Sequence, residues 1–136
     1  MDSLQRHRDY LEGEWLAAQA APLSARKAML VAMLIDAYVD RLFAAMPDAD
    51  DILDFRAAAA ARSVELGRIM ALCGGGNVKL VTEAVPVTDY GALPVEDFMV
   101  SLYNGHTVQR LLLVTADGSR HDMLETLRGA LSALAT

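Results

Sequence analysis

Apolar side chains recur at helical spacing in the first half of the chain. Between residues 3 and 20 they form a narrow seam with successive intervals of seven, four and three, which consists of Leu4, Leu11, Trp15 and Ala18. Charged side chains lie between them, so the pattern predicts an amphipathic helix over 3–20. Pro22 and Ser24 end this pattern, and a second helix is expected from about 24 to 46.

The second predicted helix has no fully polar face. Its charged residues fall on the same side as Leu30, Met33 and Leu34, so its middle is apolar all round. A helix of this kind is expected to be packed on every side. Three charged residues interrupt the apolar run from 28 to 46, and each would cost on the order of 2.5 kcal/mol at mid-bilayer, which argues against a membrane-spanning helix.

A third helix is expected over about 50–73. The acidic segment MPDADD precedes it, and acidic side chains suit a first turn whose backbone N–H groups carry partial positive charge. Five alanines at 57–61 form a smooth patch against which another helix can pack closely. The segment CGGGN at 73–77 is a strong helix stop.

The second half of the chain is richer in β-branched residues. VKLVTEAVPV at 78–87 predicts a strand with Pro86 at its end or at an edge, and TVQRLLLV at 107–114 predicts another. A final helix is expected to start with Ser119 as its N-cap and Asp122 three residues on. The apolar positions that this helix would bury are Met123, Leu127, Ala130, Leu131 and Leu134.

The segment between the two predicted strands admits two structures. Asn104-Gly105 between apolar residues is a hairpin signal, but both faces of that hairpin would be mixed. In a helix, Pro94 takes the first position, acidic residues fill the first turn, and apolar residues recur at helical spacing from Val95 to Tyr103. The helix is favoured, with Asn104-Gly105 as its left-handed end.

The expected fold class is therefore α+β in a single domain spanning 1–136. Three N-terminal helices (1–73) and a Gly-rich link (74–77) precede a small mixed β-α-β-α portion (78–136). The alternative is helices followed by a three-stranded antiparallel meander with a β-hairpin at Asn104-Gly105 and a C-terminal helix. Because two strands alone make a marginal sheet, either the helices cover it or two chains join their sheets.

Composition points to assembly. A chain of 136 residues has much surface to cover, yet 54% of its residues are hydrophobic, so part of that surface is expected to be buried against a second copy in a homodimer. The formal net charge of -6 argues against binding nucleic acid or anionic membranes. Cys73 is the single cysteine, no apolar leader begins the chain, and a cytoplasmic protein is expected.

Two segments with similar patterns suggest a ligand site. VTDYGALPVEDFMVSL at 87–102 and VTADGSRHDMLETL at 114–127 each place Thr, Asp and Gly between a strand and a helix. If the strands are parallel, both loops lie at one sheet edge, where α/β units bind ligands. The candidate ligand-binding residues are Thr88, Asp89, Tyr90, Thr115, Asp117 and Ser119, with His121 beside them. The same residue types also simply build turns.

Catalytic and metal-binding candidates are weaker. Cys73 with His106 would give a thiolate–imidazole pair, but a helix C-terminus raises a thiol pKa. Asp36 and Asp40 share a helix face without histidine ligands nearby in sequence, so no metal and no cofactor are expected.

We therefore expect a non-catalytic homodimeric module that binds a partner protein or a small ligand. The alternative is a small enzyme with its site at the loops around Asp89 and Asp117, in which His106 or His121 is the acid–base group.

Overall fold

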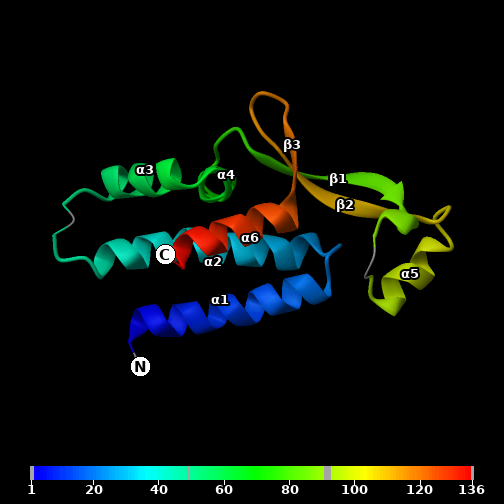
Figure 1. Ribbon diagram of the computed structural model, residues 1–136, viewed down its shortest axis with the longest axis horizontal. Coiled ribbons are helices and arrows are strands. Elements are labelled where there is room, and N and C mark those ends of the chain that lie inside the picture. Colours follow the sequence, from blue (N-terminus) through cyan, green and yellow to red (C-terminus); the bar gives the residue numbers. More distant parts are fainter. Residues whose placement is uncertain (1, 49, 91–92, 136) are drawn as a thin grey trace.

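Five helices pack around one another in the computed structural model of the protein, which describes residues 2–48, 50–90 and 93–135 (Figure 1). Helix α2 lies at the centre and contacts α1, α3, α4 and α6. These helices are α1 (Ser3–Ala20), α2 (Ala25–Ala44), α3 (Ile52–Arg62), α4 (Val64–Cys73) and α6 (Met123–Leu134). The helices predicted over 3–20 and 24–46 are confirmed, and Asp2 and Ser24 cap them.

The single helix predicted over 50–73 is wrong, because the chain breaks at Ser63. Its backbone is extended (φ -146°, ψ 122°), so it ends α3 and begins α4. The Ser63 hydroxyl accepts a hydrogen bond from the Leu66 N–H at 3.1 Å, which supplies the cap that the new helix needs. The break turns α4 away from the direction of α3, and the turned helix buries Leu66, Ile69 and Met70 (Figure 1).

The second half forms an antiparallel sheet of order β1-β2-β3. Its strands are β1 (Lys79–Pro86), β2 (Thr107–Val114) and β3 (Arg120–Asp122), and η1 (Val87–Asp89) and α5 (Val95–Ser101) lie between the first two. The α+β class is confirmed. The helix favoured between the predicted strands is confirmed as α5, while the sheet is the antiparallel meander of the alternative.

The left-handed helix end expected at Asn104-Gly105 is confirmed, whereas the alternative hairpin there and the N-cap expected at Ser119 are not. The hairpin at Asn104-Gly105 is wrong: Gly105 has φ +67° and follows α5 as the left-handed end of the helix. A tight turn forms instead at Asp117-Gly118 and pairs Arg120–Asp122 with β2. Ser119 as N-cap of the last helix is therefore wrong, because Asp122 caps α6 by accepting from the Glu125 N–H at 2.9 Å.

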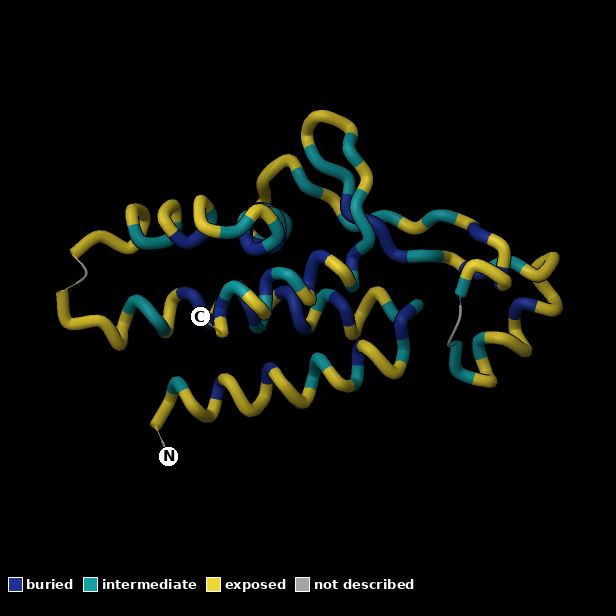
Figure 2. The backbone as a smooth tube through the Cα atoms, viewed as in Figure 1, coloured by how far each residue is buried: buried dark blue, intermediate teal, exposed yellow. Residues whose placement is uncertain are grey.

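The core lies between α2, α4, α6 and one face of the sheet (Figure 2). Of the apolar positions predicted for the last helix, Leu131 is half-buried and the rest are buried. The expectation that α2 is packed on every side is wrong within one chain, because Leu30 and Met33 are exposed, Met33 by 57%. Among the described residues, no helix is long and apolar enough to cross a membrane.

Candidate interaction surface

Helix α5 turns its polar side toward the protein and its apolar side toward solvent. Ser101 is 1% exposed, and its hydroxyl donates to the Phe98 carbonyl at 2.6 Å. Asp97 is half-buried, and both polar residues line a pocket against β2. The exposed apolar residues of α5 and of the turn after it, here called the α5 patch, are Val95, Phe98, Met99, Val100, Leu102 and Tyr103, of which Val100 also lines that pocket. A helix that packed only against its own chain would bury its apolar side and turn its polar side toward solvent.

Helix α5 also lies apart from the other helices. The helix lies at the far end of the β1–β2 ribbon and projects beyond the packed helices (Figure 1), and most of its residues are exposed (Figure 2). Pro94 precedes it at the N-cap position, Glu96 and Asp97 lie in its first turn, and the left-handed Gly105 follows its end. Seven residues are too few for a stable isolated helix in water, so α5 depends on what packs against it.

A second exposed surface lies on the first half of α2. Here called the α2 stripe, it consists of Arg26, Lys27, Leu30 and Met33. Basic side chains in a first turn are disfavoured by the helix dipole, and α2 has no acidic residue there to offset them. Neither Arg26 nor Lys27 forms an ion pair within the described part of the chain.

The two surfaces are complementary in charge and alike in apolar content. Glu96 gives the exposed start of α5 negative charge, whereas Arg26 and Lys27 give the start of α2 positive charge. Figure 1 shows both helix starts toward the same end of the molecule.

The predicted ligand loops do not share a sheet edge. Because β1 and β2 are antiparallel, Pro86 pairs with Thr107 at one end of the ribbon and Val114 pairs with Lys79 at the other. Thr88, Asp89 and Tyr90 follow β1 at the first end, and Thr115, Asp117 and Ser119 follow β2 at the opposite end. The parallel arrangement on which a joint site depended is wrong, and a ligand role for either loop alone stays a prediction.

Hydrogen bonds within the second loop give its polar residues a structural role in the turn. The Asp117 carboxylate accepts from the Thr115 hydroxyl and from the Ser119 N–H, the latter at 2.9 Å. These bonds, the Thr115 one foremost, hold the pKa of Asp117 well below its ordinary value. Gly118 takes the left-handed φ of +84°, and together with Thr115, Asp117 and Ser119 it forms a hydrogen-bonded turn.

Tyr90, from the first loop, lies beside the sheet. Burial, with a smaller contribution from Asp122, raises the pKa of its phenol, and Arg110 opposes the shift. A raised pKa keeps the phenol neutral, which suits a packed tyrosine rather than a base.

The candidate catalytic residues are dispersed. Cys73 lies at the end of α4, where burial and the charge of Asp36 raise its thiol pKa to about 11. His106 is exposed at the far end of the ribbon, just before β2, and so cannot activate this thiol. His121 lies in β3 opposite Leu113, and its buried Nε2 has no hydrogen-bond partner among the described residues.

Asp36 and Asp40 form a structural ion-pair cluster. The Arg56 guanidinium from α3 pairs with both carboxylates, and the contact to Asp40 Oδ1 is 2.8 Å. This joins α3 to α2. No group of three or more His, Cys, Asp or Glu side chains that could hold a metal ion occurs in the described ranges.

Sequence reasoning missed the surface on α5, although one signal was present. Apolar residues at 98, 99 and 100 are consecutive, and together with those at 95, 102 and 103 they cover too much of a short helix to face one core. Comparison of this chain with protein-family models, with curated proteins and with solved structures yields no match.

Proposed function

We propose that the protein is a non-catalytic homodimeric module in which the α5 patch of each chain packs against the α2 stripe of the other. The inverted orientation of α5 carries this proposal. Six exposed apolar side chains within nine residues form the kind of contiguous patch that marks an interaction surface.

A second copy fits this surface because the chain itself supplies the complement. The α2 stripe offers apolar contacts through Leu30 and Met33, and its basic residues offset the acidic first turn of α5. Since both surfaces lie toward one end of the molecule, a two-fold axis there would let both contacts form at once (Figure 1). The acidic first turn of α5 and the net charge of -6 disfavour an anionic membrane as the occupant.

Three further observations bear on the class of function. The raised thiol pKa of Cys73 and the separation of the loops around Asp89 and Asp117 disfavour the small enzyme considered as the alternative. A single cysteine is consistent with a cytoplasmic location.

Sedimentation velocity of the wild type and of Met99→Glu tests the proposal. The wild type is expected to sediment as a dimer at micromolar concentration, and the variant as a monomer with an unchanged circular dichroism spectrum, because Met99 is exposed in the single chain. Leu16→Glu is the matched control: it places the same charge at an exposed apolar position on α1 and is expected to remain dimeric. A monomeric wild type, or a dimeric Met99→Glu, would overturn the proposal.

A further inference from the structure

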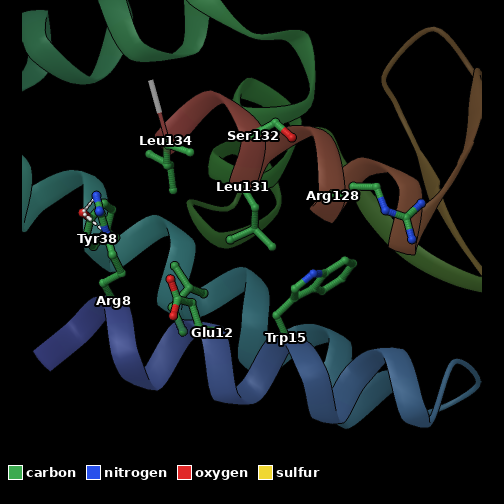
Figure 3. Close-up of a pocket in the computed structure, with 10 residues that line it drawn as sticks. Arg8, Glu12, Trp15, Tyr38, Arg128, Leu131, Ser132 and Leu134 are labelled. Atoms are coloured by element: carbon green, nitrogen blue, oxygen red, sulfur yellow. Dashed lines mark hydrogen bonds between the residues drawn. The ribbon is translucent and has the colours of Figure 1, made fainter. Parts of the chain in front are cut away.

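A groove runs between α1 and α6, with α2 beneath it, away from the α5 patch. Its volume is about 320 Å³, at the lower end of small-molecule sites. A volume of this size holds about ten non-hydrogen atoms, since a water molecule occupies roughly 30 Å³ in the liquid. Figure 3 shows Arg8 and Tyr38 at one end, Trp15 and Arg128 toward the other, and Glu12 and Leu131 between them.

Apolar side chains form much of the wall of the groove. Leu11 from α1 and Leu131 and Leu134 from α6 line it, and the Trp15 ring adds an aromatic surface. Walls of this composition suit a hydrocarbon chain or ring, because apolar groups leave water on binding there.

Two hydrogen-bond donors lie together at the Arg8–Tyr38 end of the groove. The Arg8 guanidinium donates two hydrogen bonds to the Tyr38 hydroxyl oxygen, from Nε at 3.2 Å and from NH2 at 2.7 Å. Tyr38 is 1% exposed, and within the described part of the chain its own hydroxyl proton has no acceptor. A buried donor without an acceptor is costly, so this proton is available to a ligand oxygen.

The distribution of charge also favours the Arg8–Tyr38 end of the groove as the place for an anionic group. Arg8 is exposed, and among the described residues it hydrogen-bonds the neutral Tyr38, lies over the Tyr38 ring and has no ion-pair partner. Arg128, by contrast, is neutralised by Glu125 and lies over the Trp15 ring at 5.8 Å from its centroid. Glu12 is the acidic residue in the lining, and it is exposed.

We infer that this groove binds an amphipathic carboxylate, with the carboxylate on Arg8 and Tyr38 and the apolar tail along Leu11 and Leu131 toward Trp15. An arginine N–H and a phenolic O–H are both donors that a carboxylate accepts from, and the guanidinium supplies the countercharge. The inference does not depend on dimerisation, because none of the lining residues belongs to the α5 patch or the α2 stripe.

Trp15 provides the measurement, since it is the single tryptophan of the chain and lines the groove. Its fluorescence is followed while octanoate, octanol and octylammonium are added to separate samples of the purified protein. Octanoate is expected to give a saturable change, while octanol binds at least about tenfold more weakly, because a hydrogen bond to a charged group commonly contributes that much. Octylammonium is expected to bind more weakly still.

Variants separate the two arginines. Arg8→Gln is expected to weaken octanoate binding at least about tenfold, whereas Arg128→Gln, which leaves the Arg8–Tyr38 end intact, is expected to change it by less than about threefold. Tyr38→Phe should also weaken octanoate binding, whereas Glu12→Gln should strengthen octanoate binding because it removes a nearby negative charge. Thermal unfolding by circular dichroism verifies that each variant is folded.

Three results would overturn the inference. They are the absence of a saturable change with octanoate, equal binding of the three probes, and an Arg8→Gln variant that binds as tightly as the wild type. Sedimentation measures the dimer independently, so a failure of the groove and a failure of the interface are distinguishable.

Discussion

Asp97 and Met99 lie two residues apart on α5, and it is the acidic side chain that is half-buried against β2 while the apolar one is exposed. A helix with this orientation loses apolar burial in the single chain and recovers it only when another surface covers it. The α2 stripe of a second copy is the cover that we propose.

The first prediction concerns that stripe. Met33→Glu is expected to abolish the dimer without unfolding the chain, because Met33 is 57% exposed on α2 and its replacement buries a charge only at the interface. Sedimentation velocity measures the loss of the dimer, and circular dichroism verifies the fold. Met46→Glu, at a comparably exposed methionine beyond the end of α2, is the control and should leave the dimer intact. If the Met33→Glu protein is still a dimer, the α2 stripe is not part of the interface.

A second prediction tests the break between α3 and α4. Ser63→Ala is expected to lower the free energy of unfolding by about 1 kcal/mol, because the Leu66 N–H loses its capping acceptor. Urea unfolding measures the change. Ser132→Ala, at an exposed position inside α6, is the control and should not lower the free energy of unfolding. Equal stabilities of the two variants would show that the Ser63 cap contributes nothing.

The third prediction concerns acid. The pKa of Asp117 is lowered in the folded protein, so its charged form stabilises the turn above the ordinary pKa of 3.8, and that contribution is lost as the pH falls below it. Asp117→Asn should therefore be less stable than the wild type by a constant amount above about pH 5, and the difference should shrink in stronger acid. Urea midpoints measured from neutral pH downward check this, and a difference that grows on acidification would contradict it.

A fourth prediction concerns Cys73. With its thiol pKa raised to about 11, the folded protein should react with iodoacetamide much more slowly at pH 8 than a thiol of ordinary pKa, here 9.0, and the rate should rise toward pH 11. The urea-unfolded chain is the reference, because its thiol has lost its surroundings. Alkylation of the folded protein as fast as the unfolded chain would reopen the case for a reactive thiolate.

Helices and strands followed from local patterns, while their arrangement depended on contacts that such patterns do not contain. The period of apolar residues placed α1, α2 and α5, and the β-branched runs placed β1 and β2. Two short signals were misjudged. Ser63 before a β-branched residue marked a helix start inside an otherwise helical run, and Asp117-Gly118 was the hairpin turn that had been considered at Asn104-Gly105.

The candidate sites were harder to predict than the elements. Strand direction decided whether the loops at Asp89 and Asp117 met, and two strands joined through a helix can pair either way. The groove was missed because Arg8, Tyr38 and Leu131 come from three helices distant in sequence. The α5 patch was missed because periodicity identifies an apolar face without saying whether it faces the core or solvent.

The most direct test of the proposed dimer is a charge reversal across the interface, read by sedimentation equilibrium. Lys27→Glu and Glu96→Lys are each expected to raise the dimer dissociation constant several-fold, because each places like charges at both copies of the α5–α2 contact. The double variant Lys27→Glu with Glu96→Lys restores opposite charges and should return the dissociation constant to near the wild-type value. A double variant at least as weak as the worse single variant, or a wild type that is monomeric, would contradict the account.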